Sequence, residues 1–178
     1  MLGIVEIRGN NKIMEEVAKL YCEIFSDSPW NENYILSEVL QTMDEHFKKP
    51  NAITLAALED GKLIGFTWMY EIFKSDLREG TRFSPELHFL FNGIMRIFYL
   101  QELGIKKDLR RKGNGERLTQ KLLNTGKENG ANFVVLSTNP AAMAMISLIS
   151  RIGFQNSGIV RPPKDLGRTY WFLELKKD

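Results

Sequence analysis

The chain has 178 residues, of which 43% are hydrophobic and 26% are charged, and its formal net charge is +2. These values predict one soluble folded domain spanning residues 1–178 and exclude disorder as the main state. The small net charge gives no overall case for a nucleic acid or an anionic membrane as partner. A single cysteine excludes an internal disulfide and a thiolate metal cluster. Without a leader-like N-terminus or an apolar run of about 18 residues, the expected location is cytoplasmic.

The first half of the sequence predicts a strand, two helices and a hairpin. Residues 3–8 alternate imperfectly and fit a short edge strand. Residues 12–25 carry apolar side chains at helical spacing. After a break at residues 26–30, Asn31 or Asn33 is expected to cap a second helix. The Asp60-Gly61 pair between two apolar stretches predicts an antiparallel hairpin of residues 52–59 and 63–73.

The second half predicts a central strand followed by alternating helices and strands. Residues 74–92 show no clear period and indicate either a short extra helix or a functional loop over a pocket. The remaining expected elements are a strand at 94–105, a helix at 115–124 closed by Gly126 and Gly130, a strand at 133–138, a helix at 141–151 ended by Gly153, and strands at 154–160 and 168–175. This order predicts an α/β fold with a mixed, mostly antiparallel sheet and helices on both faces.

The most informative stretch is residues 98–118, in which an apolar strand passes through a basic turn into an amphipathic helix. Bare backbone N–H groups and the positive end of the helix dipole would meet at this turn. An anion, most readily a phosphate, fits there. The alternatives are a solvated basic turn and a nucleic-acid patch at residues 106–112, and the lack of interleaved aromatic residues argues against the latter. The turn consists of Arg110, Arg111, Lys112, Gly113, Asn114 and Gly115.

The order of elements, with this turn after the fourth strand, resembles the GNAT superfamily of acetyl-CoA-dependent N-acetyltransferases. The family signature Arg/Gln-x-x-Gly-x-Gly/Ala is matched by residues 110–115, and the Gly153-Phe154 pair matches a second family landmark. Residues 25–32, together with Glu102-Leu103, are similar to the aminoglycoside-like branch. The resemblance covers nearly the whole chain.

The resemblance implies where acetyl-CoA, as co-substrate, would bind. Backbone groups of Leu103, Gly104 and Ile105 would bond the pantetheine arm, because the fourth and fifth strands splay apart in this fold. The N–H groups of residues 111–115 would hold the pyrophosphate. Asn139 would contact the pantetheine, or simply cap the next helix. A monomer and a homodimer both remain open.

Acetyl transfer to an amine requires removal of a proton from the ammonium group. Glu102 is the first candidate, since related enzymes carry an acid at the corresponding place. The ordinary pKa of glutamate lies roughly six units below that of an alkylamine, which favours action through water or orientation of a cationic substrate. A structural ion pair is the alternative role for Glu102.

The thiolate of CoA also needs a proton, and here the sequence departs from the family. Ile149 stands where many members carry the tyrosine that donates this proton, and Ala142 stands at the position of a frequent asparagine. Tyr99 is therefore a candidate catalytic donor, and solvent is an alternative. Other substitute donors are Tyr170, Ser147 and Ser150.

The predicted acceptor pocket combines aromatic rings with carboxylates, which suits a cationic amine. Its residues are Trp30, Glu32, Tyr70 and Glu71, with Trp68 and Asp76 as further candidates. The two histidines lie apart in the sequence, so no metal is assigned. We expect transfer of acetyl from acetyl-CoA to a primary amine of a small molecule, aminoglycoside-like or polyamine-like, by direct attack in a ternary complex. The alternative is a non-catalytic acyl-CoA-binding module.

Overall fold

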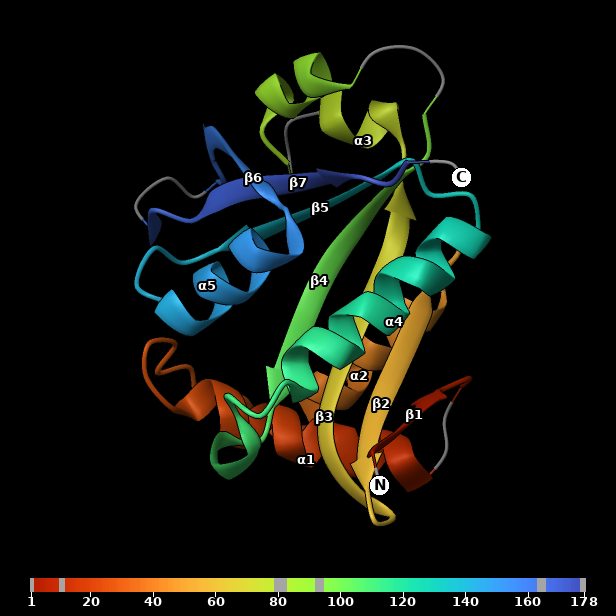
Figure 1. The fold of residues 1–178 in the computed structure, drawn as a ribbon, viewed down its shortest axis with the longest axis vertical. Helices are drawn as coiled ribbons and strands as arrows, with labels where there is room; N and C mark the ends of the chain where they lie inside the picture. Colours follow the sequence, from red (N-terminus) through yellow and green to blue (C-terminus); the bar gives the residue numbers. More distant parts are fainter. Residues whose placement is uncertain (1, 10–11, 79–82, 92–94, 163–165, 177–178) are drawn as a thin grey trace. The chain divides into compact units, whose positions relative to one another are not determined.

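The computed structural model describes residues 2–9, 12–78, 83–91, 95–162 and 166–176. Its seven strands follow the order β1-β2-β3-β4-β5-β7-β6. Strands β4 and β5 are parallel, whereas the pairs β1–β2, β2–β3, β5–β7 and β6–β7 are antiparallel. The predicted mixed, mostly antiparallel sheet is therefore confirmed (Figure 1).

The helices and strands follow the predicted order closely. The helices are α1 (Lys12–Ser26), α2 (Leu36–Phe47), α3 (Lys74–Arg78), α4 (Asn114–Glu128) and α5 (Met143–Ile152), with 3₁₀ helices η1 (Pro85–Leu90) and η2 (Lys107–Leu109). The strands are β1 (Leu2–Glu6), β2 (Ile53–Glu59), β3 (Lys62–Ile72), β4 (Ile97–Ile105), β5 (Phe133–Thr138), β6 (Gln155–Val160) and β7 (Thr169–Glu174). Within these described ranges, no helix has both the length and the apolar character needed to span a bilayer.

The chain forms two compact units. Unit 1 contains Met1–Tyr70 and Gln101–Thr125, and unit 2 contains Glu71–Leu100 and Gly126–Asp178. In unit 1, α4 covers one face of β2, β3 and the end of β4, while α1 and α2 cover the other face (Figure 1). In unit 2, α5 lies over β5, β6 and β7 (Figure 1).

Unit 1 is built around the apolar face of α1. Met14, Val17 and Tyr21 recur at helical spacing on this face and are at most 6% exposed. They belong to one core cluster with Phe66 and Trp68 of β3. The hairpin between β2 and β3 turns at Asp60 and Gly61, whose φ angles are 49° and 77°. These left-handed conformations are those of a type I′ turn, as the Asp-Gly pair predicts.

The expected asparagine cap of α2 is wrong. The helix begins at Leu36, its N-cap is Ile35, and no side chain caps it. Asn31 instead adopts a left-handed conformation with φ 49°, and the next residue, Glu32, donates its N–H to the Phe25 carbonyl at 2.8 Å. The chain thus folds back on the end of α1 before α2 starts.

In unit 2, the irregular stretch after β3 contains short helices. Helix α3 and η1 occupy residues 74–78 and 85–90, while residues 79–82 and 92–94 lie outside the described part. The expected strand start at residue 94 and the expected loop residue Pro163 also lie outside it. Gly153 ends α5 with φ 108°, and its N–H bonds the Ile149 carbonyl at 3.1 Å, as expected for a glycine C-cap.

The predicted end of α4 at residue 124 is too early, because the helix continues through Gly126 to Glu128. Of the two glycines expected to close it, Gly126 is wrong and Gly130 is confirmed, since Gly130 follows the helix in a left-handed conformation with φ 83°. A single glycine inside a helix is tolerated at a modest cost, whereas a left-handed glycine after it terminates it.

Candidate active site

The turn between β4 and α4 has the backbone conformation of an anion site. Arg111 and Gly113 both adopt left-handed conformations, with φ 60° and 81°. A Cβ atom added at Gly113 would meet no heavy atom within 4 Å, so the space beside this residue is open. The N–H of Arg117 bonds the Gly113 carbonyl at 3.0 Å and starts the helical pattern. The N–H groups of the preceding residues therefore point out from the helix end, which suits a phosphate.

Two side chains of the predicted signature hold this turn in place. The Arg110 Nε donates to the Ile105 carbonyl at 2.8 Å, and the buried Asn114 side chain donates from Nδ2 to the Leu109 carbonyl at 3.1 Å. The side chains of Arg111 and Lys112 are exposed. Arg110 and Asn114 thus shape the turn, while its exposed cations are placed to attract an anion.

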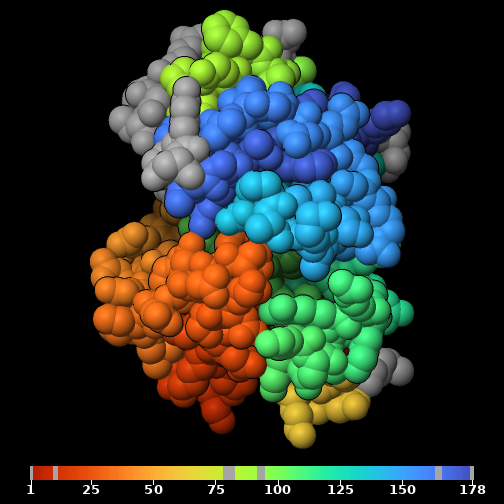
Figure 2. Space-filling view, turned by 90° about the vertical axis from the view of Figure 1, so that its left-hand side faces the viewer, coloured from red at the N-terminus to blue at the C-terminus, as the bar shows by residue number. Residues whose placement is uncertain are grey.

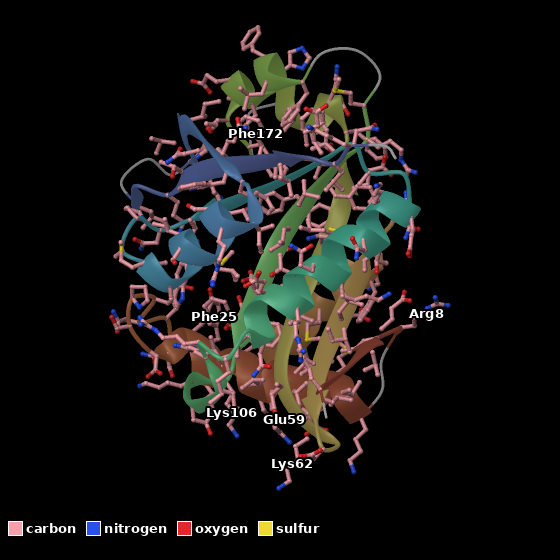
Figure 3. All side chains as sticks on the ribbon, in the orientation of Figure 1. Arg8, Phe25, Glu59, Lys62, Lys106 and Phe172 are labelled. Carbon is pink, nitrogen blue, oxygen red and sulfur yellow. The ribbon has the colours of Figure 1, made fainter. Side chains whose placement is uncertain are left out.

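The turn lies beside the end of α1 within unit 1. Figure 2 shows the segment that ends α1 (orange) next to the turn before α4 (green) on one face. Lys107 forms an ion pair with Asp27 at 3.1 Å. Phe25 and Lys106 mark this end of unit 1 in Figure 3. Residues at the end of α1 and residues of the connection from β4 to α4, which are far apart in the sequence, therefore meet near the turn.

The end of β4 packs tightly against β3 and α1. A Cβ atom at Gly104 would lie 2.7 Å from the Phe66 ring and 2.9 Å from the Ile24 side chain. A Cβ atom at Gly65, on β3, would lie 2.7 Å from the Gly104 carbonyl oxygen. A real Cβ atom does not come this close to such neighbours. At Gly65 the neighbour is a backbone oxygen, so this position requires glycine, whereas a side chain at Gly104 would displace the Phe66 and Ile24 side chains. The predicted contact of residues 103–105 with pantetheine through their backbone stays a prediction.

Glu102 faces the aromatic side chains of α1. Its Oε1 lies 3.4 Å from the Tyr21 hydroxyl, at the long end of the hydrogen-bonding range. The Tyr21 ring packs edge-on against the Tyr34 ring, with 5.1 Å between centroids, and the Tyr34 hydroxyl donates to the Glu32 carboxylate. We call these four residues, Glu102, Tyr21, Tyr34 and Glu32, the acidic tyrosine cluster. It joins two carboxylates through two phenols.

The two phenols of this cluster stay protonated at neutral pH. Burial, and next the charge of Glu102, raises the pKa of Tyr21 well above its ordinary value. Burial, and next the hydrogen bond to Glu32, raises the pKa of Tyr34 to about 12. Both tyrosines can therefore act as neutral hydrogen-bond donors beside the carboxylates.

Comparison with known proteins decides the family. A sequence model described as the acetyltransferase (GNAT) family matches residues 14–154. The chain belongs to this family. No curated protein sequence matches this acetyltransferase.

Solved structures resemble this acetyltransferase over most of its length. An aminoglycoside 6'-acetyltransferase type Ii is 16% identical, with a TM-score of 0.68, over 98% of this chain and 99% of that chain. An aminoglycoside acetyltransferase from an uncultured soil metagenomic sample is 23% identical, with a TM-score of 0.62, over 86% and 91% of the two chains. Arabidopsis thaliana NAA60, in complex with a bisubstrate analogue, is 16% identical, with a TM-score of 0.67, over 98% and 100%. At these identities the likeness shows the fold.

The other predicted acceptor residues of this acetyltransferase are dispersed. Trp30 is half-buried, with its ring 5.6 Å from that of Phe25 in unit 1. Tyr70 is buried, and the Lys49 ammonium lies 4.1 Å above its ring. Glu71, in unit 2, makes two hydrogen bonds of 2.8 and 2.7 Å to the guanidinium of Arg96. In unit 1, Glu32 shares the acidic tyrosine cluster with Glu102, and the buried Trp68 ring stacks on the Tyr21 ring of this cluster at 5.8 Å.

The predicted proton donor and Asn139 both lie in unit 2. The Tyr99 hydroxyl is 2.9 Å from the Ser137 Oγ, and the tyrosine is 3% exposed. Asn139 accepts the Ala141 N–H on its Oδ1 at 2.9 Å, so its side chain stabilises the turn before α5. Ile149 and Ala142, which stand at the positions where the resemblance leads one to expect a tyrosine and an asparagine, are buried and apolar. Neither can donate a proton.

Sequence analysis did not identify Tyr21 and Tyr34 as site residues. Both were assigned to apolar helix faces, because their spacing fits those faces. The signal that could have identified Tyr21 is its hydroxyl, since a phenol on a buried helix face needs a polar partner. The residue that supplies it, Glu102, is 81 positions away.

Proposed function

We propose that this acetyltransferase transfers the acetyl group of acetyl-CoA to a primary amine of a small cationic molecule, by direct attack in a ternary complex. The observation that carries the proposal is the acidic tyrosine cluster. Its Glu102 lies on β4, the strand that leads into the turn at residues 110–115, whose conformation suits a phosphate. A negatively charged, aromatic-lined site suits an ammonium group. The similarity in fold to aminoglycoside acetyltransferases supports an aminoglycoside-like or polyamine-like acceptor.

The residues of the turn fit the phosphate groups of CoA. Gly113 leaves open space beside the backbone, and the N–H groups at the start of α4 can donate to phosphate oxygens. In the proposed complex, the N–H groups of residues 111–115 hold the pyrophosphate, and backbone groups of Leu103 and Ile105 bond the pantetheine arm. Asn139 is proposed as a further pantetheine contact. When bound, acetyl-CoA supplies the activated acetyl thioester.

Glu102 is proposed to orient the substrate ammonium and to accept its proton through a water molecule. The neutral amine nitrogen then forms a bond to the acetyl carbonyl carbon as the carbon–sulfur bond breaks. The nitrogen gives up its second proton to solvent, and the proton donor of the thiolate regains one from solvent. Tyr99 is the proposed donor that returns a proton to the departing thiolate, with its hydroxyl oriented by Ser137. Trp30, Glu32, Tyr70 and Glu71 remain proposed acceptor contacts.

The proposal is tested with the full chain in two measurements. Calorimetry should show saturable, one-to-one binding of CoA, and substitution of Gly113 by a β-branched residue should weaken it. Release of CoA thiol from acetyl-CoA should then be followed across a panel of aminoglycosides, polyamines and neutral amines. A chain that binds no CoA refutes the proposal, and a chain that binds CoA but releases no thiol with any amine refutes the transfer step.

A further inference from the structure

A second polar cluster lies in unit 2, around the residue that follows β6. The Arg161 Nη1 donates to the Ser137 Oγ at 3.1 Å, and the same Oγ lies 2.9 Å from the Tyr99 hydroxyl. The Ser137 hydroxyl oxygen therefore accepts from Arg161 and shares a hydrogen bond with the Tyr99 hydroxyl. We call Arg161, Ser137 and Tyr99 the arginine cluster. Arg161 and Ser137 are partly exposed, so small solutes can reach them.

The backbone around Arg161 is fixed on both sides. The Ser84 hydroxyl donates to the Val160 carbonyl at 2.6 Å, and the Arg161 N–H donates to the Arg168 carbonyl at 2.8 Å. These two bonds do not involve the guanidinium. The backbone at Arg161 is therefore fixed, and the guanidinium itself is held by its bond to Ser137.

The charge of Arg161 has no carboxylate partner in the part of the chain that the structure describes. No aspartate or glutamate oxygen of these residues lies within 4.0 Å of its guanidinium. Toward the described residues, its side chain uses one of five N–H donors, in the bond to Ser137. The remaining donors can bind an anion from solution.

The neighbouring phenol does not neutralise this charge. Tyr170 is fully buried beside the cluster, and burial raises its pKa to about 12. The phenol is therefore uncharged at neutral pH. Tyr170 pairs with Ser137 across β5 and β7, so it leaves Arg161 as the charged side chain of the arginine cluster.

We propose that the arginine cluster binds the carboxylate of a small organic molecule. A single guanidinium matches a carboxylate in charge and offers it two parallel N–H groups, whereas a phosphate carries up to two charges and is better met by several cations. The Ser137 hydroxyl lies beside these N–H groups, 3.1 Å from Nη1. All three residues of the arginine cluster belong to unit 2. Carboxylate binding there does not require the proposed acetyl transfer, and it is measured without CoA.

Butyrate and its uncharged analogue butyramide are the probes. Both are titrated into the ¹⁵N-labelled full chain without CoA, and the arginine Nε–H signals are followed by NMR. The Arg161 signal is identified as the one that disappears in the Arg161→Gln variant. We expect this signal to shift saturably with butyrate and to stay still with butyramide. Arg161→Gln should lower butyrate affinity by about 10-fold or more, as expected for loss of a charge-assisted pair.

Three further variants sharpen the test. Arg151→Gln, an exposed arginine of α5, is the matched control and should keep the affinity. Arg161→Lys keeps the charge without the planar fork and should bind less tightly than the wild type. If circular dichroism shows that Arg161→Gln does not fold, Ser137→Ala serves in its place and should weaken binding a few-fold.

The proposal is overturned by any of three results. The first is a shift of the Arg161 signal with butyramide as large as the shift with butyrate. The second is a loss of affinity in Arg151→Gln as large as in Arg161→Gln. The third is tighter binding of inorganic phosphate than of butyrate at Arg161. The last result would make the site a phosphate site.

Discussion

Protonation of His46 should destabilise the fold at mildly acidic pH. The side chain is 1% exposed and is surrounded by the rings of Phe47, Trp68 and Tyr70, at 5.8, 5.9 and 6.0 Å. Burial, and next the positive charge of Lys49, lowers the pKa of His46 to about 3, partly opposed by the Ile53 backbone. In the unfolded chain a histidine has a pKa of about 6.5.

The sign and size follow from these two pKa values. Above pH 6.5 the histidine is neutral in both states and has no effect. Between pH 6.5 and 3 the unfolded chain binds a proton that the folded chain does not, so stability falls as the pH falls, by about 1.4 kcal/mol per pH unit. Between pH 7.5 and pH 5.0 the loss amounts to about 2 kcal/mol.

Equilibrium urea unfolding of the wild type and of His46→Leu at pH 7.5 and 5.0 measures this loss. The difference in unfolding free energy between the two proteins should shift by about 2 kcal/mol in favour of the variant at the lower pH. His88→Gln, which replaces the chain's other histidine, should follow the wild type. A difference between the wild type and His46→Leu that is the same at both pH values would refute the reasoning.

Four other substitutions test the site and its support. Glu102→Gln should lower turnover at neutral pH by about 100-fold while the affinity for CoA is kept. Glu23→Gln, on the exposed face of α1, is the control and should keep its turnover. If Glu102→Gln turns over as fast as the wild type, the role of Glu102 is structural. Tyr99→Phe should lower turnover if this phenol protonates the thiolate, and an unchanged rate would leave that role to solvent. Gly104→Ala should cost about 1–3 kcal/mol in urea unfolding through overpacking, while Gly3→Ala, with its nearest atom 4.0 Å away, should change stability little. Glu71→Gln should destabilise the chain by about 1–3 kcal/mol by weakening its bond to Arg96, and a raised acceptor KM at unchanged stability would instead indicate substrate contact.

Local signals predicted the parts of this protein whose structure is set by neighbouring residues. The Asp60-Gly61 turn and the Gly153 cap follow from glycine's tolerance of left-handed conformations. The turn at residues 110–115 follows from the same property, together with its position between a strand and a helix. The cap of α2 was missed because the Glu32 N–H bonds back to Phe25, a contact that helix propensities do not contain.

The partners of the site residues could not be read from the sequence. Glu102 meets Tyr21 across 81 positions, and Arg161 meets Ser137 across 24. Such contacts depend on strand order and on how each helix is turned toward the sheet. The same holds for Gly104 within β4, where the Phe66 ring on the neighbouring strand leaves little room for a side chain.

The acidic tyrosine cluster draws its two carboxylates from structurally different places. Glu102 is part of β4, two residues before Gly104, where an added carbon would press on the Phe66 and Ile24 side chains. Glu32 and Tyr34 lie in the connection between α1 and α2, next to the exposed Ile35. Libraries that vary residues 32–35 should therefore change acceptor preference while thermal stability is retained. Substitutions around Glu102 would instead impair folding, so that they remove variants before activity is measured.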